Sequence, residues 1–344
     1  MRDERDHSLL RHNTFAIDAR CRRFLEFSSV EEAQAVAAVL QPANQPYLII
    51  GAGSNLLLTG HYPGTVAHSA IRGISLTEQP DGSATLCCGS GETWDDVVAW
   101  TVARGFADLV NLSLIPGDVG ASAVQNIGAY GAEACQFISE IRAVEIATGQ
   151  VVSIAAADCH YGYRDSRFKH QWQSKFLITS VSYQLHRKST PDIAYGNIRE
   201  ELGKRGIGSP TPQQLRQVII DIRRAKLPDP TRLGNAGSFF MNPVVSREKY
   251  EELAALHPTM PHYHVSEQEE KIPAGWLIEQ CGWKGRSLGR AGVHDKQALV
   301  LVNRGGATGR EIVDLCQAIQ QDVWQRFGIA LKAEVNIVEV KSEE

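Results

Sequence analysis

A single serine within a run of small and aromatic residues is the first feature that could carry chemistry. The stretch "GNAGSFFMNP" (234–243) places Ser238 between a glycine and two phenylalanines, and its ten residues include no histidine or aspartate. Such a serine could fill a turn, act as a nucleophile with a distant base, or donate a proton to a substrate carbon. A hydrolase would pair it with His294 or His170, but the GxSxG elbow of those enzymes is missing.

A glycine-rich turn near the N-terminus is the second candidate. "PYLIIGAGSN" predicts a buried strand that runs into a loop. A Rossmann loop is not expected, because Leu56 stands where the third glycine belongs and the next dozen residues are poor material for a helix. The turn could form an anion-binding nest or merely join two strands. The residues concerned are Gly51, Gly53, Ser54 and Asn55.

A second stretch of small residues, "LIPGDVGASAVQNIGAYGAE" (114–133), favours the binding interpretation. Because few side chains stand in the way, backbone there could approach a flat or phosphorylated ligand closely. A close-packed structural loop is the alternative. Two glycine-rich, hydroxyl-containing loops joined by β-rich segments suggest one extended cofactor.

The composition is that of a globular protein with about two domains. The chain has 344 residues, of which 43% are hydrophobic and 22% charged. No apolar run approaches the length of a membrane span, and the charged start lacks a signal peptide, so the cytoplasm is expected. With a net charge of −4 and no long basic block, nucleic acid is not an expected partner, and no obligate protein partner is evident. Seven cysteines without CxxC spacing argue against disulfides and against a structural metal site.

Hydrophobic periodicity and turn signals predict a mixture of helices and strands. Helices are expected at 29–41, 92–104, 211–228, 246–258, 273–282 and 308–328. Strands are expected at 46–50, in a hairpin at 143–154, and at 176–186, 297–303 and 331–340. The segment 187–211 is the best candidate for a linker or excursion.

Six motifs in a fixed order resemble one family. They are "GAGSN", "IPGDVGASAVQNIGAYG", "YGYRDSRFK", "KLPDP", "GNAGSFFMNP" and the terminal "LKAEV". Together they resemble the UDP-N-acetylenolpyruvylglucosamine reductases, over about Asn13 to Val335. The string "IAYGNI" resembles the longer subtype, which carries a tyrosine loop.

The resemblance implies an α+β fold with two domains. Residues 1–189 would form an FAD-binding domain of the vanillyl-alcohol-oxidase (PCMH) type, with subdomains at about 1–70 and 71–189. Residues 190–344 would form an α+β substrate-binding region, whose last strand, 331–340, returns to the active site. FAD would be held non-covalently. The matching positions are Gly51, Gly53, Ser54 and Asn55 at the pyrophosphate, and Pro116, Gly117, Ser122, Gly128, Ala129, Tyr130 and Ile178 along the rest of the cofactor.

The resemblance also implies a reaction, the NADPH-dependent reduction of an enolpyruvyl ether on a nucleotide sugar. Flavin N5 would deliver hydride to the methylene carbon, and Ser238 would give a proton to the neighbouring carbon. Arg164 would bind the substrate carboxylate, although a surface pair with Asp165 is an alternative. Glu334, in its protonated form, would help to stabilise the enolate-like charge. Further substrate contacts are implied for Tyr195, Arg223, Lys226, Asn242 and Gln297.

Two departures from the family and two rival functions accompany this interpretation. Met241 stands where the family often has lysine, and Lys332 and Ala333 stand where it often has a Glu-Pro pair. We expect these changes to tune affinity without altering the reaction. The rivals are an FAD-dependent oxidase of the same fold, which would use oxygen, and a non-catalytic module that binds nucleotide sugars.

Overall fold

The chain divides into two compact units in a computed structural model that describes residues 1–41 and 46–340. The first unit consists of Met1–His7, Cys21–Ala52 and Pro63–Arg224, and the second of Ser8–Arg20, Gly53–Tyr62 and Ala225–Glu344. The expected boundary at residue 189 differs from this division. The reason is that the helix leading to Arg224 buries its apolar stripe in the core of the first unit.

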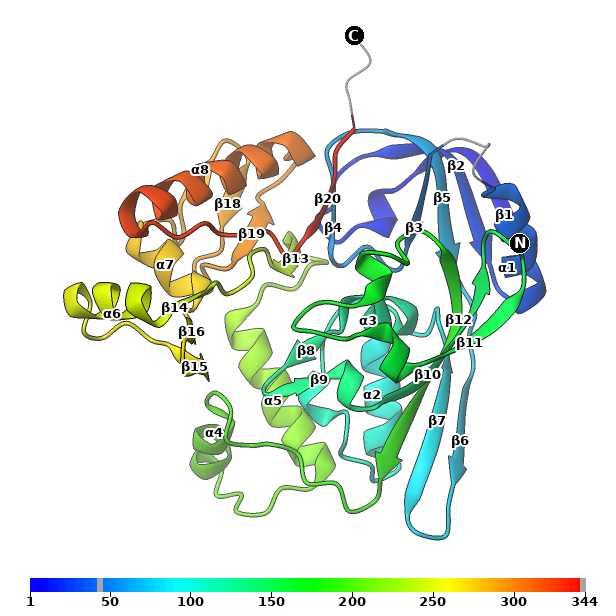
Figure 1. Cartoon of the computed structure of the whole chain (residues 1–344), viewed down its shortest axis with the longest axis horizontal. Helices are drawn as coiled ribbons and strands as arrows, with labels where there is room; N and C mark the ends of the chain where they lie inside the picture. Colours follow the sequence, from blue (N-terminus) through cyan, green and yellow to red (C-terminus); the bar gives the residue numbers. More distant parts are fainter. Residues whose placement is uncertain (42–45, 341–344) are drawn as a thin grey trace. The chain divides into compact units, whose positions relative to one another are not determined.

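A four-stranded sheet in the order β1-β2-β5-β3 belongs to the first unit (Figure 1). Its strands are β1 (Arg2–Ser8), β2 (Arg20–Phe27), β5 (Tyr62–Ser69) and β3 (Tyr47–Ile50). The predicted helix that follows β2 is confirmed as α1 (Val30–Val39), which begins where the Ser29 hydroxyl accepts a hydrogen bond from the Glu32 amide at 3.2 Å. Ala33, Val36 and Ala37 carry its buried face.

A five-stranded antiparallel sheet in the order β11-β10-β12-β7-β6 forms the other large layer of this unit. Its strands are β11 (Val151–Ala155), β10 (Ile138–Glu145), β12 (Phe176–His186), β7 (Ser83–Gly89) and β6 (Ile74–Glu78). The predicted hairpin is confirmed, with Val144 opposite Val151. The helix α2 (Trp94–Ala103), also predicted, contributes to the same core with its buried Trp94 and Val98.

The helix α3 (Val119–Gln125) was not predicted, since its residues lie in the small-residue stretch that we expected to be a loop. Small side chains let it pack against β12 and the core, where Val119 and Ala123 are buried. The excursion after β12 contains α4 (Ile198–Lys204). The predicted α5 (Pro212–Lys226) follows it. The remaining elements of this unit are the ribbon β8 (Gly128–Ala129) and β9 (Ala132–Glu133), with 3-10 turns at Val110–Leu112, Ala134–Gln136, Ala156–Cys159 and Arg167–Lys169.

The second unit is built on a four-stranded antiparallel sheet in the order β13-β19-β18-β17. Its strands are β13 (Gly234–Ser238), β19 (Val300–Asn303), β18 (Ala291–Val293) and β17 (Ser287–Leu288). Three predicted helices are confirmed as α6 (Arg247–Leu256), α7 (Ala274–Gln280) and α8 (Gly309–Phe327). A small sheet adds β14 (Val244–Ser246), β16 (Glu269–Lys271) and β15 (Tyr263–Ser266), and one 3-10 turn lies at Leu10–His12.

The strand predicted at 331–340 is shorter than expected. Regular pairing is confined to β20 (Asn336–Val338), which runs parallel to β4 (Leu56–Leu58). The expected alternation is still visible upstream, because Leu331 and Val335 are buried while Lys332 is exposed. A single bridge between Phe240 and Ala333 pairs this upstream part with another segment of the same unit.

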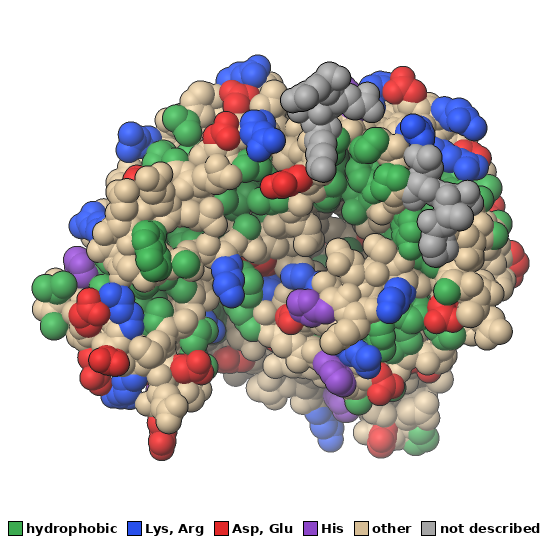
Figure 2. All heavy atoms as spheres, turned by 45° about the horizontal axis from the view of Figure 1, so that its top comes forward, with side chains coloured by type: hydrophobic (Ala, Val, Ile, Leu, Met, Phe, Trp, Pro, Cys, Tyr) green, Lys and Arg blue, Asp and Glu red, His purple; other side chains and the backbone are tan. Residues whose placement is uncertain are grey.

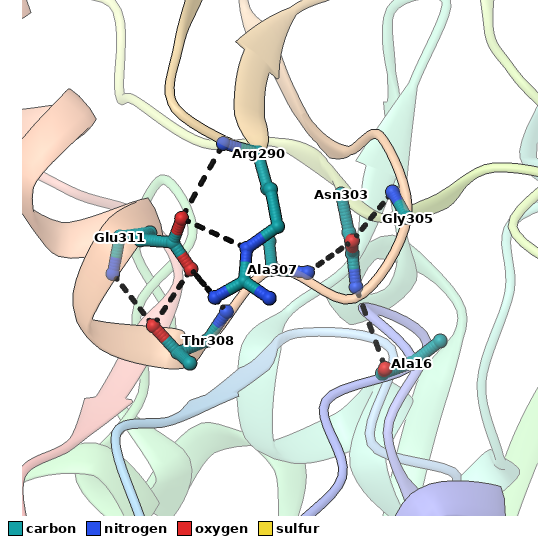
Figure 3. Close-up of polar contacts among 7 residues, drawn as sticks. All are labelled: Ala16, Arg290, Asn303, Gly305, Ala307, Thr308 and Glu311. Atoms are coloured by element: carbon teal, nitrogen blue, oxygen red, sulfur yellow. Dashed lines mark hydrogen bonds and ion pairs between the residues drawn. The ribbon is translucent and has the colours of Figure 1, made fainter.

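Side-chain hydrogen bonds secure the start of α8 (Figure 3). The predicted capping box is confirmed, since Thr308 Oγ1 accepts from the Glu311 amide at 3.2 Å and Glu311 Oε2 accepts from the Thr308 amide at 2.9 Å. The same carboxylate binds Arg290 through Nε at 3.1 Å and Nη2 at 2.9 Å. Nearby, Asn303 Oδ1 accepts the amides of Gly305 and Ala307, both at 2.9 Å. These contacts tie the helix to the sheet of the second unit.

Charged side chains of both signs lie on the face of the molecule that Figure 2 shows. On the face drawn in Figure 2, acidic and basic side chains are interspersed and neither sign forms a continuous patch. Among the described residues, no group of three or more His, Cys, Asp or Glu side chains could hold a metal ion. Nor does that part of the chain contain a helix both long and apolar enough to cross a membrane.

Candidate active site

Within the first unit, the start of the glycine turn lies against the second stretch of small residues. A Cβ added at Gly51 would lie 3.0 Å from Ala121 Cβ and 3.2 Å from Asp118 Oδ2, so the turn after β3 lies directly against the start of α3. Gly117, with a φ of 129°, supplies a left-handed turn just before this helix. The sequence predicted that these stretches share a ligand, and the fold makes them neighbours.

The first backbone amides of α3 donate hydrogen bonds to carbonyl groups of the protein itself. Val119 and Gly120 donate to the carbonyls of Glu92 and Ser90, at 2.9 and 2.8 Å. The Ser122 hydroxyl is 2% exposed, donates to the Val119 carbonyl at 2.6 Å and lies 3.2 Å from the phenol oxygen of Tyr183. A ligand at this helix would therefore meet the backbone around Ser122, because its hydroxyl points into the core.

The segment after α3 turns sharply, and its small residues leave the backbone open to close approach. Asn126 and Tyr130 both adopt left-handed conformations, with φ values of 47° and 49°. Gly128 and Ala129 form a partly buried strand between them. Ile178, 8% exposed, lies on β12. Burial raises the pKa of the Tyr130 phenol, against the opposing effect of the positive charge of Arg223.

Arg164 is held by carbonyl oxygens of this same segment. Its Nη2 donates to the Gly128 carbonyl, and its Nη1 donates to the Asn126 carbonyl at 3.4 Å. A Cβ added at Gly128 would lie 2.6 Å from Nη1 and 2.8 Å from the Ala132 carbonyl oxygen, so the close approach favours glycine. The backbone of Arg164 is itself left-handed, with a φ of 56°. Asp165, the alternative partner considered above, pairs with His170 Nε2 at 2.7 Å.

Two further residues expected to bind substrate belong to the first unit. Arg223, on α5, is partly buried, and its Nε has no hydrogen-bond partner among the described residues. Burial lowers the pKa of its guanidinium below the usual value, while Tyr130 and Asp95 oppose this effect. Tyr195 is 44% exposed and follows β12 in the excursion. The Arg223 Nε thus suits an anionic ligand, and the exposed Tyr195 ring lies at the surface of the excursion.

The remaining residues of the glycine turn are anchored within the second unit. Gly53 has a φ of 67°, and a Cβ there would lie only 2.0 Å from the His12 carbonyl oxygen. Asn55 donates from Nδ2 to the Glu334 carbonyl at 3.2 Å and accepts from the Asn336 amide at 3.1 Å. Asn55 therefore also has a structural task, since it secures the segment that carries Glu334.

The structure brings Ser238 and Glu334 together in the second unit. Ser238 is the last residue of β13, exposed and paired with Val300 of β19. The next residue, Phe239, accepts a hydrogen bond from the Glu334 amide through its carbonyl at 2.8 Å. Phe239 and Phe240 are 0% and 1% exposed, so they fix this chain segment in the core. The two candidate catalytic side chains are thus carried by adjacent segments.

The departures from the family pattern lie on these adjacent segments. The Met241 amide donates to the Lys332 carbonyl at 2.9 Å, and Ala333 forms the bridge with Phe240. Both contacts use the backbone, which every residue except proline can supply in full. The altered side chains therefore leave the pairing that positions Glu334 intact.

Three further residues expected to bind substrate also lie in the second unit. Asn242 Oδ1 accepts from the Ala274 amide at 2.9 Å, which leaves its amide donors for other partners. Gln297 Oε1 accepts from the Leu299 amide at 3.3 Å in the same manner. Lys226 is exposed at the end of α5.

Two family models match the chain and define its class. Residues 22–155 match the FAD binding domain, and residues 229–338 match the C-terminal domain of UDP-N-acetylenolpyruvoylglucosamine reductase. With the α+β units described above, these matches make the protein an FAD-dependent oxidoreductase. The predicted fold class and cofactor are thereby confirmed.

Full-length relatives narrow the class to one family. The UDP-N-acetylenolpyruvoylglucosamine reductase of Paraburkholderia phymatum is 47% identical over 333 residues, which cover 96% of each chain. That of Bacteroides fragilis is 48% identical over 335 residues, or 97% of this chain and 100% of the relative. The chain belongs to the UDP-N-acetylenolpyruvoylglucosamine reductase family, as its motifs predicted. The crystal structure of the corresponding Thermus caldophilus enzyme has the same fold, with a TM-score of 0.67 at 20% identity over 98% of this chain and 99% of that one.

The residues of the first unit fit FAD on one observation. At Gly51 and Gly128 an added Cβ would lie 3.0 Å from Ala121 Cβ and 2.6 Å from Arg164 Nη1, so glycine keeps both turns free of a side chain and lets a ligand approach the backbone. The matching positions in this unit are Gly51, Pro116, Gly117, Ser122, Gly128, Ala129, Tyr130 and Ile178, and those in the second unit are Gly53, Ser54 and Asn55.

Proposed function

We propose that the protein reduces the enolpyruvyl ether of UDP-N-acetylenolpyruvoylglucosamine to the lactyl ether of UDP-N-acetylmuramate, with NADPH as reductant. This step belongs to the synthesis of peptidoglycan precursors, and we place it in the cytoplasm. The observation that supports the proposal most directly is the hydrogen bond between the Glu334 amide and the Phe239 carbonyl, which pairs the segment that carries Glu334 with the segment that carries Ser238. The names of the relatives supply the substrate.

Ser238 is the proton donor in this proposal. FAD, when bound, supplies the hydride that it has received from NADPH. Ser238 lies exposed at the end of β13, where its hydroxyl can reach a ligand while the backbone stays paired with Val300. An enolate carbon is a strong base, so a hydroxyl held beside it suffices as acid. The serine then recovers its proton from solvent.

Arg164 and Glu334 stabilise the charge that develops on the substrate. We assign the substrate carboxylate to the Arg164 guanidinium, because a guanidinium can hold a carboxylate through parallel hydrogen bonds and stabilise its charge, which increases as hydride adds. Glu334 acts as a neutral hydrogen-bond donor, because an ionised carboxylate would repel the enolate. The main chain of both residues is fixed, by the Lys169 Nζ bond to the Arg164 carbonyl at 2.9 Å and by the Phe239 contact.

The nucleotide part of the substrate is assigned to the basic and amide side chains. Arg223 and Lys226 neutralise the diphosphate, and Asn242 and Gln297 donate from the amide groups that their own unit leaves available. Tyr195 adds an exposed ring from the excursion that resembles the longer subtype.

An absorbance experiment on the purified protein tests this function. We expect a flavin spectrum that NADPH bleaches and that the enolpyruvyl nucleotide restores without oxygen. In D₂O, the product should carry deuterium at the carbon that bears the ether oxygen. A folded but colourless protein would favour a binding module, and bleaching that only oxygen reverses would favour an oxidase. Either result would refute the proposal.

A further inference from the structure

Asn126 joins the cofactor segment to the turn that carries Arg164. Its side chain is 0% exposed, with Nδ2 donating to the Gly162 carbonyl at 2.8 Å and to Glu133 Oε2 at 3.1 Å. Its Oδ1 accepts from the Cys135 amide at 3.0 Å. The NH₂ group of the Asn126 side chain can only donate and its oxygen can only accept. These partners therefore allow one orientation of the Asn126 side chain.

Glu133 carries this connection on to the guanidinium. Its Oε1 lies 3.4 Å from Arg164 Nη1, while its Oε2 is held by Asn126. The Asn126 carbonyl accepts from the same Nη1. Asn126 therefore acts on Arg164 through its own backbone, through the Glu133 carboxylate and through the Gly162 carbonyl, two residues before the arginine.

Helix capping alone does not explain these contacts. Asn126 is the left-handed C-cap of α3, and glycine meets that conformational need best. Glycine, however, could form none of the three side-chain hydrogen bonds. The asparagine thus serves the Arg164 turn in addition to the helix end.

We propose that Asn126 is a positioning residue that, together with Glu133, fixes the guanidinium of Arg164 for the substrate carboxylate. The role rests on the proposed function of Arg164. A bidentate contact requires the fork to be held in one plane, and a long side chain on a strained turn does not hold that plane by itself. Glu133 also balances the charge of the partly buried guanidinium before substrate arrives.

The variant Asn126→Gly tests this role, since glycine keeps the left-handed backbone and removes all three side-chain bonds. We expect KM for the enolpyruvyl nucleotide to rise about 10- to 100-fold, as small misplacements of a binding group commonly do. The rate at which NADPH bleaches the flavin should stay unchanged. The Kd of UDP-N-acetylglucosamine should also stay unchanged, because this compound lacks the carboxylate. Ser174→Gly, at an exposed left-handed position of the same unit, is the matched control.

Two more variants keep the test decisive. Asn126→Asp retains the acceptor for Cys135 but repels Glu133 and the Gly162 carbonyl, so it should show the same loss if Asn126→Gly folds poorly. In an Arg164→Met background, Asn126→Gly should cause no additional rise in KM. An unchanged KM, or an equal loss of UDP-N-acetylglucosamine binding, would overturn the positioning role. A wild-type protein that leaves the enolpyruvyl nucleotide intact would refute the proposed function instead, and the role with it.

Discussion

Arg164 and Ser238 are held in opposite ways. Around Arg164, in the first unit, carbonyl oxygens and a carboxylate fix the end of the side chain, and the backbone adopts a left-handed conformation. Around Ser238, in the second unit, the sheet fixes the backbone through Val300, and the side chain stays exposed. The first region fixes the orientation of the Arg164 guanidinium, and the second fixes the position of the Ser238 backbone.

The chemistry of the two groups explains this difference. A guanidinium recognises a carboxylate through two parallel bonds, so its plane must be set in advance. A hydroxyl has a single proton that rotates about one bond, so placing its backbone is enough. Where the functional group at the end of a long side chain must be oriented, neighbouring groups form hydrogen bonds with it. Where a short side chain acts, strand pairing suffices.

The largest effect on the reaction is expected from a substitution of Ser238, the residue whose position depends on its backbone. Ser238→Ala keeps the strand pairing and removes only the hydroxyl, so proton transfer should slow by about 10²- to 10⁴-fold. Bleaching by NADPH should proceed as in the wild type, because it does not require this proton. Stopped-flow measurement of each half-reaction would show the split. Equal slowing of both halves would mean that the residue supports the fold and not the proton transfer.

A smaller effect is expected from a substitution of Gly128, because the absence of a side chain there leaves room for the Arg164 guanidinium. In Gly128→Ala, the new Cβ would lie 2.6 Å from Nη1 and 2.8 Å from the Ala132 carbonyl oxygen, so the guanidinium must shift. We expect KM for the enolpyruvyl nucleotide to rise by about 10²-fold. Gly203→Ala is the matched control, since no atom lies within 4 Å of the added Cβ. Similar KM values for the two variants would contradict the proposed crowding of Arg164, and the flavin content of each would be measured alongside.

The sequence predicted the elements with strong local signals. The capping box at Thr308 and the apolar stripe of α5 were correct because each depends on residues a few positions apart. The helix α3 was missed, because its glycines and alanines are typical of a loop and only packing against β12 makes them helical. The extent of the last strand was overestimated, since alternation in burial continues where regular pairing does not.

The candidate site shows the same limit. The motifs predict roles for Ser238, Arg164 and Glu334, because the resemblance ties those positions to a reaction, and these roles stay predictions. Asn126 and Glu133 gave no such signal, although both lie within the motif region. Their contacts to Arg164 span more than thirty residues of sequence. Only the folded chain reveals a role that depends on such a contact.

The smallest effect is expected at the capping box, where side chains brace the second unit without touching Ser238. Hydrogen bonds from Arg290 and then from the Thr308 amide lower the pKa of Glu311 from 4.5 to about 2. A lowered folded-state pKa means that the ionised group stabilises the fold above pH 4.5, and that this contribution is lost as the pH falls toward about 2. In Glu311→Gln the amide can still cap the helix but carries no charge, so its Tm should fall below that of the wild type at pH 7, with the gap narrowing toward pH 3. A gap that is constant with pH would show that the Arg290 pair adds nothing, and that the sheet carrying Ser238 is braced by the cap alone.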